Sequence, residues 1–315
     1  MLDIELLKKY AFIEPLLGIV AILSWSSMVA ITRKLSEEIG TVIAASYQCL
    51  GAGFLGLFVI LLYEKNIDSL LKIPVAHLLY CGLPFIIYMI SFFLAMGLSK
   101  TREHTISIAL INYLWPSLTL LFSVLFFGRY CNNLIILIVG IVLAFLGAYF
   151  AVAYDSDESY FYETIHKFLK HFKGNPISIL LAFISAISWA IYTNMNNKLG
   201  ISNGIFAIPI FFLIAGLILL VSKQFLSKVE LKLSFIAILY LLYAIAVPNL
   251  LAYVAWTIST QNDKFIIVTI FSFFLPLIST MISCIYFNKK FTVDLIRSCV
   301  LILLGTVICN YAVPR

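Results

Sequence analysis

The sequence has little charge and lacks the motifs that identify common soluble enzymes. Charged residues make up 11% of its 315 residues, and hydrophobic residues make up 63%. Soluble domains carry about 25% charged residues, so most of this chain's surface is suited to lipid. The sequence also has no H-E-x-x-H helix and no P-loop. These absences exclude the corresponding zinc proteases and ATP-driven pumps. We therefore expect no catalytic residues and no enzyme.

Cysteine pairs and basic clusters are missing as well. None of the six cysteines forms a C-x-x-C pair, so neither a disulfide framework nor a metal site is indicated. We expect buried thiols, no metal and no cofactor. The net charge of +6 is spread over the loops without the basic stripe that follows a phosphate backbone. The sequence thus predicts a lipid bilayer, and not a nucleic acid, as its surroundings.

Long hydrophobic runs are abundant, and each is long enough for a membrane-spanning helix of about 20 residues. They lie at residues 16–32, 41–63, 74–98, 105–127, 131–153, 176–194, 204–222, 233–257, 265–287 and 293–312. Backbone groups in hydrocarbon must be hydrogen-bonded internally, and the period-two polarity of a lipid-facing barrel is absent. The fold class predicted is an all-α polytopic membrane protein with ten transmembrane helices.

The two halves of the chain share motifs at matching spacings. Ser24-Trp25 is followed nine residues after the Trp by Lys34, and Ser188-Trp189 is followed at the same distance by Lys198. Likewise, Arg129 and Lys289 each lie thirteen residues after a proline, Pro116 and Pro276. Five spans per copy would reverse the second copy in the bilayer. This arrangement predicts two inverted five-helix repeats, 1–153 and 176–315, around a central cavity, joined by an interfacial connection, 154–175. Inverted repeats are typical of secondary transporters.

Central positions of the predicted spans contain no Asp, Glu, Lys or Arg, since Glu14, Asp294 and Arg297 lie at span edges. Proton-coupled carriers need a titratable group within the membrane. The pattern favours a facilitative carrier driven by the substrate gradient. Proton coupling through an edge group such as Glu14 remains the alternative.

Aromatic residues occupy the middle of several spans, although tryptophan usually gathers at the membrane–water interfaces. All four tryptophans, Trp25 included, lie within spans. A tryptophan at that depth requires a partner for its indole N–H, or a cavity; the alternative is plain packing between helices. Around these positions the sequence predicts a substrate-binding wall of aromatic side chains and one amide: Tyr88, Asn112, Tyr113, Trp115, Trp189, Tyr192, Tyr253 and Trp256. Such a wall suits a small amphipathic zwitterion better than a sugar phosphate, which would call for Arg or Lys.

At these motifs the chain resembles EamA-type carriers of the drug/metabolite transporter superfamily. The resemblance runs nearly end to end and is carried most specifically by Asn112-Tyr113-Leu114-Trp115-Pro116-Ser117-Leu118-Thr119, with Ser24-Trp25, Trp189-Ala190-Ile191-Tyr192 and Tyr253-Val254-Ala255-Trp256. Within that group the chain is similar to bacterial exporters of aromatic amino acids. The resemblance implies a basket of ten helices, export across the bacterial inner membrane, and cavity-lining roles for Tyr88, Tyr113, Trp115 and Trp189. The second half departs from the first at Leu275, the counterpart of Trp115, so we expect a lopsided cavity.

Our interpretation is a monomeric secondary transporter that exports aromatic and other apolar amino acids across the inner membrane. A broad-specificity drug or metabolite exporter with proton coupling is the alternative, and a structural membrane protein without substrate is disfavoured by the duplication. Two indications of the protein's orientation in the membrane disagree. Eight of the 21 Lys and Arg residues fall on the side of the chain ends and thirteen on the other, so the positive-inside rule alone places the ends outside the cytoplasm. The resemblance implies cytoplasmic ends, and we follow it.

Overall fold

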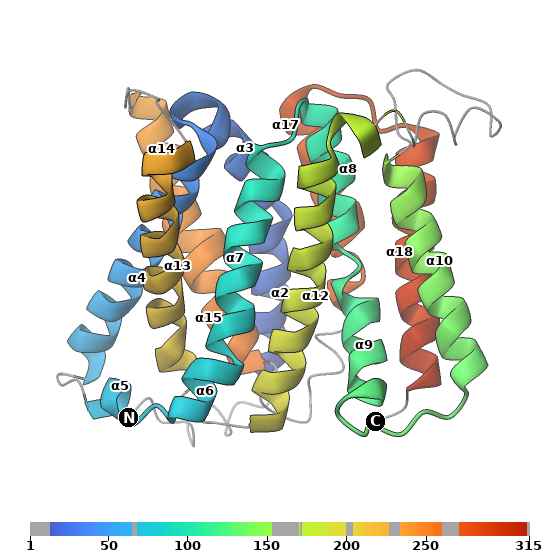
Figure 1. Ribbon diagram of the computed structural model, residues 1–315, viewed down its shortest axis with the longest axis horizontal. Coiled ribbons are helices and arrows are strands. Elements are labelled where there is room, and N and C mark those ends of the chain that lie inside the picture. Colours follow the sequence, from blue (N-terminus) through green and yellow to red (C-terminus); the bar gives the residue numbers. More distant parts are fainter. Residues whose placement is uncertain are drawn as a thin grey trace.

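The computed structural model describes residues 13–64, 68–152, 170, 172–199, 204–226, 234–259 and 271–313. All regular elements in this part of the chain are helices, which run roughly parallel to one another (Figure 1). The helices before the central connection are α2 (Ile13–Ser26), α3 (Met28–Ile39), α4 (Thr41–Glu64), α5 (Asp68–Leu71), α6 (Val75–Tyr80), α7 (Gly82–Gly97), α8 (Arg102–Asn112), α9 (Trp115–Leu125) and α10 (Leu134–Val152). Those after it are α12 (Pro176–Leu199), α13 (Gly204–Leu226), α14 (Phe235–Ala244), the π-helix η2 (Ile245–Leu251), α15 (Ala252–Ser259), α17 (Leu275–Phe287) and α18 (Val293–Ala312).

The predicted all-α polytopic fold is confirmed. Within the described residues, nine helices or helix pairs are long and apolar enough to cross a membrane. α17 is shorter, at 13 residues, because the ninth span breaks at Phe273 and Phe274, ahead of Pro276 in the first turn of the helix. Of the predicted interfacial connection, 154–175, the structure describes only 170 and 172–175. α2 begins and α18 ends at the same face of the bundle (Figure 1).

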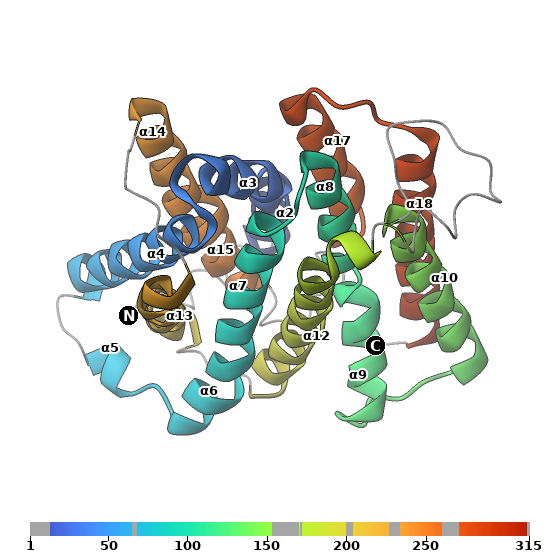
Figure 2. The ribbon, with the colours of Figure 1, turned by 45° about the horizontal axis from the view of Figure 1, so that its top comes forward.

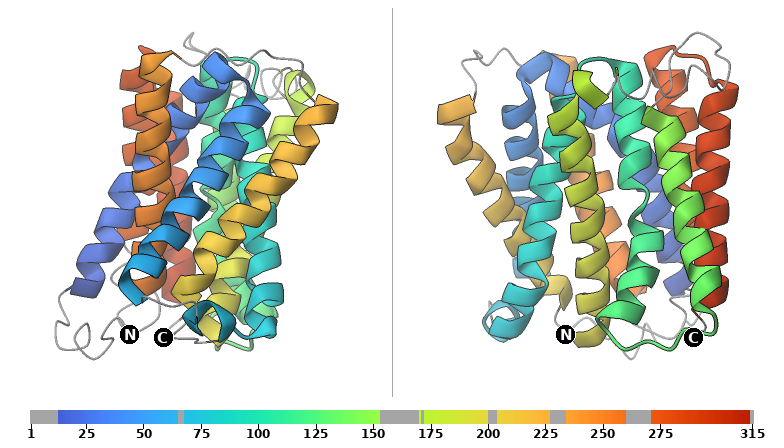
Figure 3. Two further views of the ribbon diagram at one scale, coloured as in Figure 1. Left: turned by 90° about the vertical axis from the view of Figure 1, so that its left-hand side faces the viewer. Right: turned by 45° about the vertical axis from the view of Figure 1, so that its right-hand side comes forward.

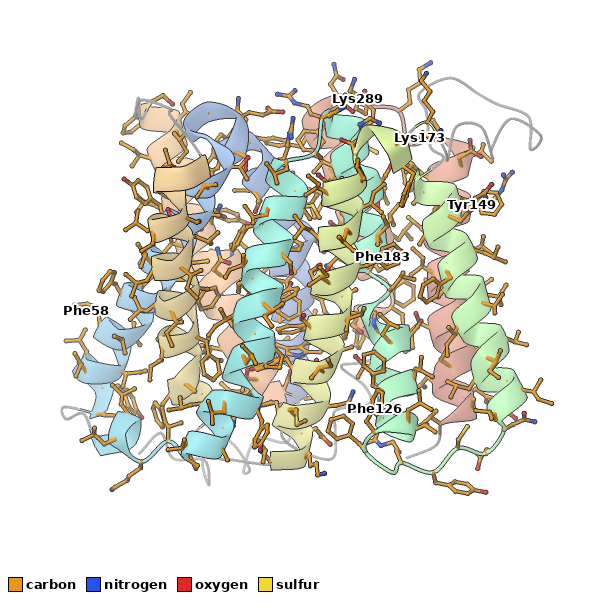
Figure 4. The ribbon with its side chains drawn as sticks, viewed as in Figure 1. Phe58, Phe126, Tyr149, Lys173, Phe183 and Lys289 are labelled. Carbon is orange, nitrogen blue, oxygen red and sulfur yellow. The ribbon has the colours of Figure 1, made fainter. Side chains whose placement is uncertain are left out.

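Large apolar side chains cover the outside of the bundle. Phe58 projects from its outer edge (Figure 4) and is 58% exposed, and Ile285 is 78% exposed. Soluble monomers rarely expose such continuous apolar surface, so the helical perimeter is the lipid-facing surface that the composition predicts.

The closest helix pairs join the two halves of the chain. α10 packs against α18, α4 against α13, α7 against α12 and α2 against α15, and the first two pairs lie at opposite ends of the bundle (Figures 1 and 3). Glycine permits the first contact: a Cβ on Gly305 would lie 2.5 Å from the carbonyl oxygen of Gly140. Small residues of this kind let membrane helices approach closely. The two halves therefore pack against each other through several helix pairs. The repeat boundaries at 153 and 176, and the inversion of the second repeat, stay predictions.

Four of the described spans are broken near mid-membrane, and the break in the ninth lies directly ahead of α17. The first breaks at Ser27, between α2 and α3, and the fourth breaks at Tyr113 and Leu114, ahead of Pro116 in the first turn of α9. The eighth contains the π-helix with Pro248 inside it. Because proline has no N–H, it leaves a carbonyl four residues earlier without its usual donor. Here the side-chain amide of Asn249 donates to the Ala244 oxygen at 2.8 Å and replaces that bond. Such breaks at membrane depth are typical where helices line a cavity.

Candidate functional site

An aromatic cluster occupies the centre of the bundle. Trp25 comes from the end of α2, Trp189 from the middle of α12 and Trp115 from the start of α9. The ring centroids of Trp25 and Trp189 are 5.7 Å apart, and those of Trp115 and Trp189 are 6.3 Å apart, both edge-on. Aromatic pairs prefer this geometry at such separations. The helix breaks at Ser27 and Tyr113 place these rings at the same depth, so the mid-span tryptophans of the sequence meet in space.

Tyrosines close the cluster on the sides of α7 and α15. Tyr88 lies 4.7 Å from Trp189 between ring centroids, and Tyr192 lies 4.9 Å from the same ring. The Tyr253 hydroxyl donates to the Tyr88 hydroxyl at 3.0 Å, which satisfies two polar groups at membrane depth. Trp256 packs between Trp25 and Trp115, with centroid distances of 5.3 and 5.6 Å. Six of the seven aromatic residues of the predicted wall, all but Tyr113, thus form one contiguous group with Trp25.

A small cavity lies within this group. Its volume is about 20 Å³, and it is lined by Trp25, Met28, Tyr88, Phe92, Asn112, Tyr113, Trp115, Trp189 and Leu275. A cavity needs roughly 10–15 Å³ to hold one water, so the cavity is closed down to about the size of a single water. Five of the eight predicted wall residues line it: Tyr88, Asn112, Tyr113, Trp115 and Trp189. The other three, Tyr192, Tyr253 and Trp256, pack in the layer behind them.

Several lining residues fall outside the predicted wall. Trp25 carries the same Ser-Trp motif as Trp189, so the internal duplication was the signal that could have included it. Leu275 occupies the position equivalent to Trp115 and also lines the cavity. Met28 and Phe92 have no distinguishing pattern in the sequence. Their position follows only from the packing of α3 and α7 against the cluster.

Asn112 is the polar member of the cavity wall. The Ser185 hydroxyl donates to its Oδ1 at 2.7 Å, linking α8 to α12. The same hydroxyl also lies 2.8 Å from the Ala182 oxygen. Among the residues that the structure describes, no group accepts a hydrogen bond from the Asn112 amide nitrogen. This leaves an amide donor at the wall of the cavity.

Trp25 provides a second donor without a partner. Its side chain is buried, and within the described part of the chain its indole N–H has no hydrogen-bond partner. Buried polar groups in folded proteins are almost always paired, so an exception calls for an explanation. A ligand or water that enters the opened cavity would supply the missing acceptor.

The chemistry of a metal or redox centre is not assembled in the described residues. No group of three His, Cys, Asp or Glu side chains lies close enough to hold an ion there. The six thiols are free; five are buried and Cys131 is half-buried. The site is therefore made of aromatic faces, two N–H donors and a few apolar side chains.

Comparison with known proteins agrees with this architecture. The EamA-like transporter family model matches residues 13–153 and 176–311. The aromatic amino acid exporter YddG of Escherichia coli (strain K12) is 30% identical over 302 residues, which cover 95% of this chain and 97% of that protein. The protein of the same name from Salmonella typhimurium (strain 14028s / SGSC 2262) is 27% identical over 300 residues, with coverage of 95% and 97%.

The fold is also found in a solved structure. A crystal structure superposes with a TM-score of 0.66 at 18% identity, covering 95% of this chain and 97% of that one. At that identity the likeness concerns the fold alone. The family match, in contrast, extends over most of the chain and includes the helices that carry the aromatic cluster. The chain belongs to the EamA-like transporter family and is a multi-pass membrane transporter.

Proposed function

We propose that this transporter exports aromatic amino acids, and related apolar ones, across the bacterial inner membrane, with both chain ends in the cytoplasm. The observation that carries the proposal is the composition of the cavity wall. Of the nine lining residues, Trp25, Tyr88, Phe92, Tyr113, Trp115 and Trp189 are aromatic, and Asn112 supplies an amide. The relatives named as aromatic amino acid exporters support the same substrate class.

Each part of an aromatic amino acid has a partner in this wall. The ring of the substrate can stack on or meet the edges of the tryptophans, and the ammonium group can face a π-system for about 0.5–2 kcal/mol. The carboxylate can accept from the Asn112 amide and the Trp25 indole N–H. We assign substrate contact to Tyr88, Asn112, Tyr113, Trp115 and Trp189, with Tyr192, Tyr253 and Trp256 as the second layer that shapes the cavity.

The closed cavity indicates how binding and transport are connected. About 20 Å³ is far too small for an indole ring, so the cluster must separate before an amino acid enters. Movement of one repeat against the other would do this, as in other inverted-repeat carriers. The structure thus corresponds to a state in which the central site is too narrow for the substrate.

The positions of the charges support transport down the substrate gradient. Asp294 and Arg297 pair with each other at 3.2 Å at the start of α18, and the side chain of Glu14 lies outside the described residues. None of the cavity-lining residues is titratable near neutral pH. A proton has no acceptor at the substrate site, so coupling is not expected there.

Reconstitution into proteoliposomes tests both parts of the proposal. We expect labelled tryptophan, phenylalanine and tyrosine to move down their gradients at rates that an imposed pH step leaves unchanged. A neutral sugar and a sugar phosphate serve as matched negative substrates. Concentrative uptake driven by a pH gradient alone would refute facilitated transport, and absence of amino acid flux would refute the substrate class.

One observation favours the alternative, a proton-coupled exporter of broader specificity. His77 on α6 is 1% exposed, and within the described residues both of its ring nitrogens lack a hydrogen-bond partner. Its ring stacks on Phe211 with centroids 6.1 Å apart. A buried imidazole without partners is a titratable group inside the bundle, near the start of the third span. If a pH step does drive uptake, His77→Gln should abolish that response while leaving downhill exchange intact.

A further inference from the structure

In the part of the chain that the structure describes, the identified ion pairs gather at one membrane face. All five that the structure describes lie opposite the face where α2 begins and α18 ends: Arg33–Glu37, Lys34–Glu38, Arg102–Glu37, Lys289–Glu103 and Arg297–Asp294. Side-chain nitrogens and oxygens are conspicuous along this upper face, where Lys289 is labelled (Figure 4). The charged network is therefore a feature of one side of the bundle.

This network ties together three helices from both halves of the chain. Glu37 of α3 accepts from Arg102 of α8 at 2.8 Å and from Arg33 of its own helix at 2.9 Å. The neighbouring Glu103 pairs with Lys289, which follows α17. Arg102 also lies over the ring of Phe287, the last residue of α17, at 5.5 Å. The upper ends of α3, α8 and α17 lie close together (Figure 2), and the three helices contact one another.

The same three helices descend to the central cavity. Met28 on α3, Asn112 on α8 and Leu275 on α17 all line it. A spacing of four residues keeps side chains on one face of a helix. Thr32 lies one turn above Met28, and Ser279 and Ser283 lie one and two turns above Leu275. Hydroxyls thus continue the cavity-facing sides of α3 and α17 toward the charged face.

These hydroxyls are buried and have no partner. Thr32, Ser279 and Ser283 are each 1% exposed, and no described group bonds to their side-chain oxygens. The Tyr113 hydroxyl is near Ser279 without reaching hydrogen-bonding geometry. Other buried hydroxyls in the described part of the chain bond to their own helix, as Ser298 does to the Asp294 oxygen at 2.8 Å, or to a neighbouring helix, as Ser117 does to Thr306 at 2.9 Å.

An unpaired buried hydroxyl costs free energy, and three of them on two facing helices need a reason. That cost disappears if the hydroxyls gain water or substrate in another state of the protein. A carrier that opens between α3, α8 and α17 would hydrate all three at once. The polar substrate groups would then have partners on their way from the cavity to the membrane face.

We propose that the α3/α8/α17 seam is the substrate route between the aromatic cavity and the charged face. Thr32, Ser279 and Ser283 line the route when it opens, and the pairs Glu103–Lys289 and Glu37–Arg102 hold it shut. The substrate itself rests on the proposed function. The seam can be tested without any substrate.

Cysteine accessibility in nanodiscs, where both faces meet solvent, tests the seam. Thr32→Cys and Ser279→Cys are reporters for a charged, membrane-impermeant thiol reagent, with labelling read site by site by mass spectrometry. Glu103→Gln removes the link between α8 and α17. Exposed ion pairs contribute modestly, so we expect labelling at both reporters to accelerate about fivefold through a larger open population. Lys289→Gln should have the same effect from the other side of the pair.

Two controls separate opening of the seam from general loosening. Ser298→Cys, buried on α18 away from the seam, should stay unlabelled in every background. The exchanged pair Glu103→Lys with Lys289→Glu should return labelling to within about twofold of the parent. Unchanged labelling at both reporters after Glu103→Gln, or an equal rise at Ser298→Cys, would overturn the proposal.

Addition of tryptophan distinguishes this inference from the proposed function. If the ion pair controls labelling and tryptophan alters the rate, both stand. If the ion pair controls labelling and tryptophan has no effect at saturating concentration, the seam stands and the aromatic amino acid is refuted as cargo. If tryptophan is transported but the reporters never react, the route lies elsewhere.

Discussion

Asn112 allows the role of the cavity wall to be measured as a difference between two ligands. Its Oδ1 accepts from Ser185 at 2.7 Å, while its amide nitrogen is available to the cavity. We predict that Asn112→Leu, which keeps the branched shape of the side chain, weakens binding of tryptophan but not of indole. Indole has the same ring but no carboxylate, so it does not use the amide donor.

The magnitude follows from the chemistry of the lost bond. A hydrogen bond to a charged group contributes about 1.5–3 kcal/mol, and 1.4 kcal/mol corresponds to tenfold in Kd. The Kd for tryptophan should rise about 10- to 150-fold, and that for indole should change less than about threefold. Thermal stability should fall little, because interhelical hydrogen bonds in membranes average about 0.6 kcal/mol and Ser185 keeps the Ala182 oxygen as an acceptor at 2.8 Å.

Competition binding in detergent is the assay, with labelled tryptophan displaced by unlabelled tryptophan or by indole. Ser185→Ala is the matched control, since it removes the link to Asn112 and leaves the amide donor in place. Its Kd for tryptophan should stay within about threefold of the parent. Equal losses for tryptophan and indole in Asn112→Leu would refute recognition by the amide. A loss in Ser185→Ala as large as that in Asn112→Leu would show that the interhelical bond matters instead.

Three further predictions concern packing and coupling. Trp115→Ala should lower uptake in proteoliposomes at least tenfold, because it removes a ring from the cavity wall. The control Phe183→Ala removes a ring from the perimeter pair with Phe145 and should leave uptake near the parent value. Equal effects of the two substitutions would contradict a role of Trp115 in binding. Gly305→Leu should abolish folding, seen as loss of the monodisperse peak in detergent, because its Cβ would lie 2.5 Å from a backbone oxygen of α10. If transport is facilitative, His77→Gln should have the same downhill flux as the parent between pH 6 and 8. A parent flux that depends on pH, together with a His77→Gln flux that does not, would favour proton coupling.

Much of the architecture could be predicted from the sequence because it depends on local properties. Hydrophobic length fixes a membrane span regardless of its neighbours, so nine spans and the apolar part of the tenth could be placed from residue order alone. Pro116 and Pro276 lie in the first turns of α9 and α17, where proline fits, and their matching positions in the two halves could be read from the sequence. The tryptophans at mid-span depth likewise predicted a central aromatic group.

Tertiary structure decided which of these residues face the cavity. The first half of the chain has no motif that matches Tyr253 and Trp256. Only the packing of α15 against α2 places these two residues behind Trp25. The small cavity volume, about 20 Å³, depends on the orientations of the aromatic rings, which cannot be predicted from a sequence pattern. The Glu103–Lys289 pair and the unpaired hydroxyls of Thr32 and Ser279 depend on contacts between residues far apart in the chain. Hydrophobic length and proline act within one segment, whereas cavities, ion pairs and missing hydrogen bonds exist only between segments.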